Sequence, residues 1–306
     1  MKIFVLCNSD ILATNTIHAL AQSKQLAGIG VPNTHATHLS MVFQSIGISQ
    51  NDIHVLEKAI LSNQLAALIQ TLEPDCILTL TFPWKIPVQI LNQCKHGCIN
   101  FHFGKLPDYR GADPIFWQLK NQEATGGISV HIMNEKIDEG AILHFAELPI
   151  MPGETYGMHS IRLAILAAEI AGKLWTILQM PAQEQFISGQ KNFFKSPDQQ
   201  NITINWQLQT AASIIALVNA ANPKYLGAIS YIRQQLVRIL EVDTVNVNST
   251  EKFAPGTIVH ADKQNGLIVA CCDEQFISIQ IVQVKEGYLS GYKLFTLGLS
   301  IGEKFG

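Results

Sequence analysis

The sequence has little charge of either sign. Of its 306 residues 15% are charged, and 21 basic against 24 acidic side chains give a formal net charge of −3. Such a balance creates no overall field that would attract a polyanion, so composition gives nucleic-acid binding no support. The apolar share of 47% is enough to build a buried core, which excludes a disordered or collagen-like chain.

Long apolar runs are also missing. The longest stretch, residues 163–175, contains Glu169 and Lys173 and falls short of the ~20 apolar residues that a membrane span needs. The first apolar run ends at Asn8, which is too early for the core of a signal peptide. The cysteines mostly lie inside strand-like segments, as buried reduced thiols would. We therefore expect a cytoplasmic protein.

Two kinds of binding motif are absent. The segment CNSDILATN, which follows the first expected strand, has no glycine, so the glycine-rich turn of a dinucleotide site is excluded. Cys94 and Cys98 are close in sequence, but no second ligand pair follows at the spacing of a structural zinc site. We expect no bound metal.

What is present is an alternation of strand and helix patterns. Apolar strand-like runs at residues 2–7, 26–31, 53–56 and 75–80 are separated by helical periodicity, which predicts an α/β fold with a Rossmann-like parallel or mixed sheet. Residues 155–178 read as one long helix that closes this domain. We expect an N-terminal domain at 1–180, a linker at 181–203 rich in Gln, Asn, Ser and Pro, and a C-terminal domain at 204–306. Short β-like runs in the last part favour a small OB-like β-barrel.

The most informative stretch runs from residue 99 to 117. A strand that ends in Asn100-x-His102 presents an amide and an imidazole on one face, at the sheet edge where open α/β folds bind ligands. An acidic turn with Asp138 follows. An amide, an imidazole and a carboxylate suit acyl transfer to an amine, because they can stabilise an oxyanion and move a proton. A purely structural histidine is the alternative that this short motif leaves open, and His131 on a later strand is expected to be structural or to support the site.

The wider pattern resembles a known family. Asn100-x-His102, the loop Leu106-Pro107-x-Tyr109-Arg110-Gly111 and the turn Asp138-x-Gly140 are similar to the signature of formyltransferases that use 10-formyltetrahydrofolate. That family includes methionyl-tRNA, sugar-nucleotide and glycinamide-ribonucleotide formyltransferases. The resemblance implies that Asn100, His102 and Asp138 are catalytic and that 10-formyltetrahydrofolate is the cosubstrate. It extends into the C-terminal part, where Asn222-Pro223 and Pro255-Gly256 resemble the OB-like domain of the longer members.

The resemblance also implies binding residues. The folate-side residues would be Phe82, Trp84, Lys85, Ile86, Ile137 and Gly140. In the loop after the catalytic strand, Tyr109 and Arg110 belong to the matching motif, whereas Lys105 departs from the family's pattern, and all three are expected to face the acceptor. For Arg110 the alternatives are an acceptor phosphate and an ion pair with Asp108 or Asp113.

The acceptor is the least determined part. Between Lys24 and Lys58 the chain has no Lys or Arg, whereas a tRNA acceptor stem is held largely through basic side chains. We therefore expect an N-formyltransferase that acts on a small amine, such as an amino sugar on a nucleotide or a biosynthetic intermediate. The alternatives are a methionyl-tRNA formyltransferase and a non-catalytic folate-binding module. The oligomeric state stays open.

Overall fold

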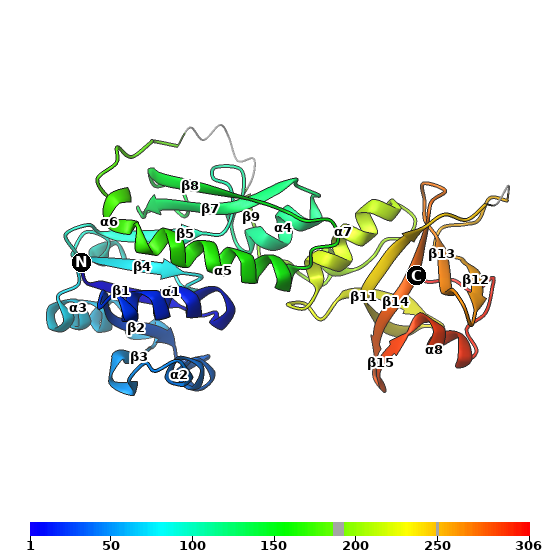
Figure 1. Ribbon diagram of the computed structural model, residues 1–306, viewed down its shortest axis with the longest axis horizontal. Coiled ribbons are helices and arrows are strands. Elements are labelled where there is room, and N and C mark those ends of the chain that lie inside the picture. Colours follow the sequence, from blue (N-terminus) through cyan, green and yellow to red (C-terminus); the bar gives the residue numbers. More distant parts are fainter. Residues whose placement is uncertain (186–192, 249–250) are drawn as a thin grey trace. The chain divides into compact units, whose positions relative to one another are not determined.

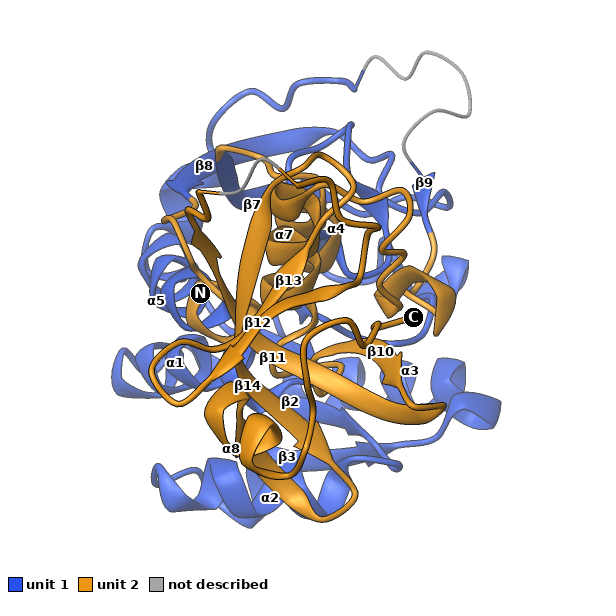
Figure 2. Ribbon diagram, turned by 90° about the vertical axis from the view of Figure 1, so that its right-hand side faces the viewer, with its two compact units in different colours: residues 1–114, 125–149, 160–194 blue, residues 115–124, 150–159, 195–306 orange. Residues whose placement is uncertain are grey.

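The computed structural model describes residues 1–185, 193–248 and 251–306, in two compact units. Unit 1 comprises residues 1–114, 125–149 and 160–194, and unit 2 comprises residues 115–124, 150–159 and 195–306 (Figure 2). The chain therefore enters unit 2 twice before its last third. The sequence-based division into residues 1–180, 181–203 and 204–306 stays a prediction.

Unit 1 is built on a mixed sheet. Within the described residues it has seven strands in the order β3-β2-β1-β4-β5-β7-β8 (Figure 1). The first five in sequence are parallel, and the last two are antiparallel to their neighbours. The bounds are β1 (Ile3–Cys7), β2 (Leu26–Pro32), β3 (Ile53–Leu56), β4 (Cys76–Leu80), β5 (Cys98–His102), β7 (Thr125–Ile132) and β8 (Ile142–Pro149). The predicted α/β class with a parallel or mixed sheet is confirmed.

The central strands are covered on both faces. Every residue of β1 and β4 is buried, as expected for parallel strands between two layers of helices. Helix α1 begins after Ser9, whose hydroxyl accepts a hydrogen bond from the Leu12 amide at 3.3 Å. Leu61 and Leu65 of α3 pack into one core cluster with Phe4 and Ile77. The helices of unit 1 are α1 (Asp10–Gln22), α2 (Ala36–Ser45), α3 (Leu61–Leu72) and α6 (Leu174–Ile177), with short 3-10 turns η1 (Gln50–Asp52), η2 (Lys58–Ile60) and η3 (Val88–Ile90). Nearly all of α4 (Pro114–Lys120) and the first turn of α5 (Tyr156–Gly172) belong to unit 2, and the rest of α5 belongs to unit 1.

Residues 155–178 do not form one helix as expected. Helix α5 ends at Gly172 and α6 starts at Leu174, with Lys173 outside both. Glycine is a poor helix former, because its backbone loses the most freedom on folding, and this favours a break there. Two very short strands, β6 (Arg110–Gly111) and β9 (Phe193–Phe194), pair in parallel within unit 1.

Unit 2 contains an antiparallel sheet. Its described strands run in the order β10-β11-β14-β13-β12, and β15 pairs with β14. Helix α7 packs against β11, and α8 packs against β13 and β14. The bounds are η4 (Gln200–Ile202), α7 (Ala211–Ala221), β10 (Ala228–Ile232), β11 (Gln235–Val245), β12 (Ile258–Asp262), β13 (Gly266–Ala270), β14 (Phe276–Val284), β15 (Gly287–Ser290) and α8 (Gly291–Thr296). A β-rich C-terminal part is confirmed, and its closure into an OB-like barrel stays a prediction.

In the parts of the chain that the structure describes, none of the helices combines the length and the apolarity that crossing a bilayer demands.

Candidate active site

Three polar side chains form one row across neighbouring strands. Asn100 in β5 lies opposite Thr79 in β4 and opposite His131 in β7. Two residues further along β5 stands His102, which is paired with Ser129 and is buried. Because alternate residues of a strand share a face, the Asn100 and His102 side chains point to the same side of the sheet. The register of strands β4, β5 and β7 alone therefore brings the Thr79, Asn100, His102 and His131 side chains close together.

The carboxamide of Asn100 has a fixed orientation. Its Oδ1 accepts a hydrogen bond from the Thr79 hydroxyl, with the two oxygens 2.7 Å apart. Its Nδ2 lies 3.0 Å from Nε2 of His131. Nδ1 of His131 lies 3.2 Å from the carbonyl oxygen of Ile132, which can only accept. That contact places the His131 proton on Nδ1, so Nε2 accepts from Asn100. A flipped amide would place Oδ1 against the unprotonated Nε2 of His131 and lose that hydrogen bond.

Asp138 joins this row from the turn between β7 and β8. Its Oδ2 accepts the Gly111 amide at 2.8 Å and lies 3.7 Å from Nδ1 of His102. Its Oδ1 lies 3.5 Å from Nδ2 of Asn100 and 3.6 Å from Nε2 of His131. The three residues predicted to be catalytic therefore come together with His131, and their catalytic role and the structural or supporting role expected of His131 stay predictions.

Hydrogen bonding determines the tautomer of His102. Nε2 of His102 lies 2.6 Å from the carbonyl oxygen of Tyr109, so Nε2 carries the proton. Nδ1 is then the basic nitrogen, and it is the atom that faces Asp138. The ring can therefore receive a proton at Nδ1 without giving up its anchor to Tyr109.

Burial and charge set the protonation states. Burial lowers the pKa of the His102 imidazole and outweighs the opposite effect of Asp138, so the ring is neutral at pH 7. Burial by itself would raise the pKa of Asp138. The positive charge that His102 and His131 carry when protonated, together with hydrogen bonds such as that from the Gly111 amide, acts more strongly in the other direction and brings the pKa of Asp138 down to about 2. A neutral base thus stands beside a permanent carboxylate.

The turn that carries Asp138 is held from two sides. Asp138 has a positive φ of 55°, and the Gln185 amide donates to the carbonyl oxygens of Asp138 and Gly140 at 3.1 and 2.7 Å. A Cβ at Gly140 would lie 1.7 Å from the Ile132 carbonyl oxygen, so a larger residue cannot enter. Thr79, Gln185 and the Gly111 amide were missed by sequence reasoning, because their roles depend on pairing between distant segments.

The expected folate-side residues line the loop after β4 and the Asp138 turn. The rings of Phe82 and Trp84 meet edge to face at 5.4 Å, and both pack against the core cluster around Leu61. Ile86 is itself a core residue, with 2% of its surface exposed, so it supports the loop from inside. Ile137 is exposed, and Gly140 lies against the β7 backbone.

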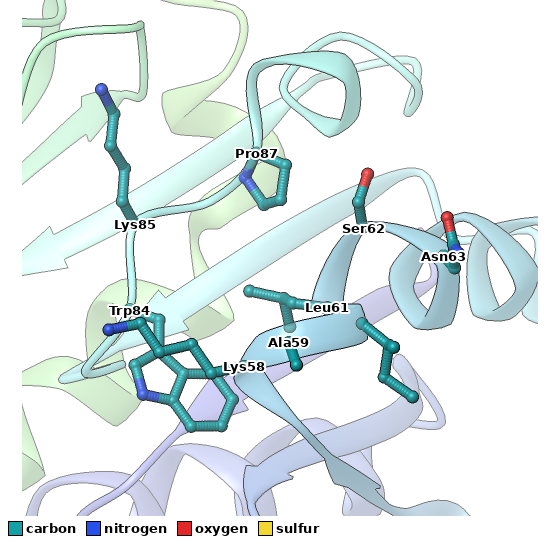
Figure 3. Close-up of a pocket in the computed structure, with 9 residues that line it drawn as sticks. Lys58, Ala59, Leu61, Ser62, Asn63, Trp84, Lys85 and Pro87 are labelled. Atoms are coloured by element: carbon teal, nitrogen blue, oxygen red, sulfur yellow. The ribbon is translucent and has the colours of Figure 1, made fainter.

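A pocket of about 300 Å³ opens beside this loop. Trp84, Lys85 and Pro87 lie on one side of it, and Ser62 and Asn63 of α3 lie on the other (Figure 3). Asn100, His102 and Asp138 are not among its lining residues. The pocket therefore adjoins the predicted folate loop without containing the candidate catalytic group.

The residues expected to face the acceptor differ in exposure. Lys105 is exposed, whereas Tyr109 is buried and stacks on Phe194. The Arg110 guanidinium is buried and contacts Glu139, a partner that sequence reasoning did not consider. Contact with an acceptor stays a prediction for all three residues. Among the described residues, no group of three or more His, Cys, Asp or Glu is arranged to hold a metal ion.

Comparison with known proteins agrees with this geometry. Residues 5–171 match the family model "Formyl transferase", and residues 198–297 match "Formyl transferase, C-terminal domain". The chain is 30% identical to the methionyl-tRNA formyltransferase of Ruminiclostridium cellulolyticum over 271 residues, which is 84% of this chain and 83% of the relative. It is 32% identical to the enzyme of the same name from Bacillus mycoides over 224 residues, 70% of this chain and 68% of that one.

Solved structures show the same fold at lower identity. HypX from Aquifex aeolicus in complex with tetrahydrofolic acid superposes with a TM-score of 0.65 at 14% identity, covering 99% of this chain and 50% of that one. An N-formyltransferase from Helicobacter canadensis in complex with folinic acid and dTDP-3-aminofucose gives a TM-score of 0.64 at 16% identity, covering 91% and 98%. Since one family model spans more than half of the chain and a second spans most of the remainder, this protein is a member of the formyl transferase family.

Proposed function

We propose that this protein transfers the formyl group of 10-formyltetrahydrofolate to the primary amine of a small acceptor. The observation that carries the proposal is the convergence of Asn100, a neutral His102 and an ionised Asp138 at one sheet edge. These groups match the needs of transfer between two nitrogen atoms. No nucleophilic side chain is required, because the acceptor amine is itself the nucleophile.

Each group has a distinct task in this reaction. Nδ2 of Asn100 has two hydrogens. One is bonded to His131, and the other, which faces Asp138 at 3.5 Å, turns to the formyl oxygen as negative charge develops on it, an effect of about 2.7–4 kcal/mol per donor. Nδ1 of His102 takes the proton that the acceptor amine loses when its new bond to the formyl carbon forms. The same proton is returned to the leaving nitrogen as the old carbon–nitrogen bond breaks. Asp138 stabilises the imidazolium between these two transfers.

The cosubstrate supplies the activated formyl group, and the chain offers fitting surfaces for it. A folate combines flat aromatic rings with carboxylates. Trp84 and Pro87 present apolar surface at the open pocket, and Lys58 and Lys85 add positive charge to its lining. The relatives crystallised with folates support this assignment: one HypX structure contains tetrahydrofolic acid, and the Helicobacter enzyme contains folinic acid.

Two observations bear on the acceptor. The segment between Lys24 and Lys58, which includes β2, α2 and β3, has no Lys or Arg to hold a phosphate backbone. The Helicobacter relative was crystallised with an amino sugar nucleotide. Both observations support a small amine as the formyl acceptor.

The second candidate is methionyl-tRNA formylation, favoured by the names of the relatives at 30–32% identity. A gel-shift assay with initiator methionyl-tRNA at physiological salt tests it. Tight binding together with formylation of the bound aminoacyl group would establish tRNA as the acceptor and overturn our assignment.

The proposed reaction is tested with an acceptor panel and 10-formyltetrahydrofolate, by following release of tetrahydrofolate. We expect turnover with an amino sugar nucleotide or a related amine and none with His102→Ala or Asp138→Ala, both folded by circular dichroism. Unchanged turnover in both variants would refute the catalytic assignment. Folate binding without product from any acceptor would instead indicate a binding module.

A further inference from the structure

Residues 193–194 form a strand against the loop that follows the catalytic strand β5. Arg110 pairs with Phe193 and Gly111 with Phe194, and the Ala112 amide donates to the Phe194 carbonyl oxygen at 2.8 Å. The rings of Tyr109 and Phe194 are stacked, with centroids 5.2 Å apart and planes 9° from parallel. The two segments are far apart in sequence, and residues 193–194 lie within the stretch that composition marks as a linker.

Residues 109–111, which contact residues 193–194, also hydrogen-bond to both acid–base groups of the site. The Tyr109 carbonyl oxygen accepts the Nε2 hydrogen of His102 at 2.6 Å. The Gly111 amide donates to Oδ2 of Asp138 at 2.8 Å. A shift of residues 109–111 would therefore move the imidazole and the carboxylate together.

Close packing leaves this segment little room. Gly111 has a φ of +96°, and a Cβ added to it would lie 2.2 Å from the Phe194 carbonyl oxygen. Side chains alternate along β9, so that Phe194 lies half-buried over Tyr109 while Phe193 is exposed. The Phe194 ring and backbone thus contact the same loop whose Tyr109 and Gly111 bond to His102 and Asp138.

We propose that Phe194 is a positioning residue, which sets the placement of His102 and Asp138 through the backbone of Tyr109 and Gly111. The inference rests on the proposed function for its kinetic consequence only. Catalysis by oriented groups is sensitive to displacement, and a misplacement of about 1 Å can cost on the order of 10²-fold in rate. Loss of the Phe194 ring therefore lowers turnover although the side chain touches no reacting atom.

The test compares three variants of the full chain. Phe194→Ala removes the stacked ring, Phe194→Tyr keeps it, and Phe193→Ala removes the exposed neighbouring ring as a matched control. With 10-formyltetrahydrofolate and an accepted amine, we expect kcat to fall about 10- to 100-fold in Phe194→Ala, and KM for the folate to change less than about threefold. The other two variants are expected to stay within about twofold of the original chain. Equal losses in Phe193→Ala and Phe194→Ala, or a loss confined to KM, would overturn the proposal.

A second readout does not depend on turnover. In chain labelled with 15N-histidine, the buried Nε2 hydrogen of His102 gives a downfield NMR signal, assigned by its absence from His102→Gln. We expect this signal to shift or broaden in Phe194→Ala and to be retained in Phe194→Tyr. An unchanged signal in folded Phe194→Ala would refute the positioning role, and Phe194→Leu replaces the alanine variant if that one does not fold. Absence of turnover in the original chain would count against the proposed function alone.

Discussion

Each of the site's three polar groups is hydrogen-bonded to at least one group outside the predicted catalytic three. Asn100 is fixed by Thr79 and His131, His102 by Tyr109, and Asp138 by Gly111. Such support matters because a catalytic hydrogen-bond donor must already point to the place where charge will develop. At the residue scale, the proposed activity should therefore depend on side-chain and backbone groups that do not touch the reacting atoms.

Thr79 provides one test of this dependence. Replacing it with Val preserves its shape and removes the hydroxyl that donates to Oδ1 of Asn100. That acceptor is half-buried, so losing this partner costs at most the ~1–3 kcal/mol of a fully buried unsatisfied group. We expect kcat to fall about 10-fold as the amide loses its orientation, with little change in KM. Thr71→Val, which removes an exposed hydroxyl bonded within α3, is the control for kinetics and melting temperature. Full activity of Thr79→Val would contradict the orienting role.

The pH dependence follows from His102. Burial lowers its pKa below the ordinary value of 6.5, so the ring stays neutral, and able to accept a proton, down to pH values below 6.5. The acid limb of kcat/KM is expected below pH 6.5, while Asp138, with its pKa of about 2, remains ionised throughout. Initial rates between pH 4.5 and 8 check this expectation. An acid limb centred above pH 7 would show that a different group controls the rate.

The lowered pKa of His102 also makes folding stability depend on pH. Below pH 6.5 the unfolded chain binds a proton at His102 that the folded chain does not bind until lower pH. Folding stability should therefore decline as the pH falls from 6.5 through the lowered pKa of His102. Urea unfolding at pH 7 and pH 5 should show a smaller decline for His102→Gln than for the original chain. Equal declines would mean that His102 is not neutral in the folded state.

At the element scale, the turn between β7 and β8 delivers Asp138 to the end of β5. Its geometry depends on close approach of Gly140 to the β7 backbone and on two hydrogen bonds from Gln185. Strand pairing alone does not position the carboxylate, because Asp138 lies outside both strands. The turn is thus a separate structural requirement of the site.

Gly140→Ala tests that requirement. The added methyl group would lie 1.7 Å from the Ile132 carbonyl oxygen, so the turn must move and carry Asp138 with it. We expect formyl transfer to fall by at least about 10²-fold. Gly172→Ala is the control, since its added Cβ meets no atom within 4 Å at the end of α5, and it should leave kcat unchanged. Near-normal kcat in Gly140→Ala would show that Asp138 is held independently of this turn.

At the scale of the whole molecule, the two units share the chain in an interleaved way. Segments 115–124 and 150–159 belong to unit 2, although they precede the predicted linker. Within unit 2, Phe116 meets Tyr225 edge to face at 5.2 Å, and the Gly157 amide donates to the Asn222 carbonyl oxygen at 3.3 Å. The last hundred residues are therefore supported by parts of the chain from its middle.

A fragment of residues 204–306 should be less stable than the same region in the intact chain. It lacks the ring of Phe116, and burial of an aromatic ring commonly contributes about 1.5–3 kcal/mol. Calorimetry on the fragment and on the intact chain checks this, with Tyr225→Ala in the intact chain as a smaller perturbation of the same contact. An equal melting temperature for the fragment would show that residues 204–306 fold independently.

The sequence alone determined the α/β class and most strand and helix positions, and it predicted Asn100, His102 and Asp138 as the chemical group. Those features depend on local periodicity and on short motifs, which a linear pattern preserves. The tertiary structure decided what surrounds them: Thr79 beside Asn100, Glu139 on Arg110, and Phe194 against Tyr109 and Gly111. These contacts join residues that are distant in sequence, so they follow from sheet register and strand pairing, which residue order by itself does not express.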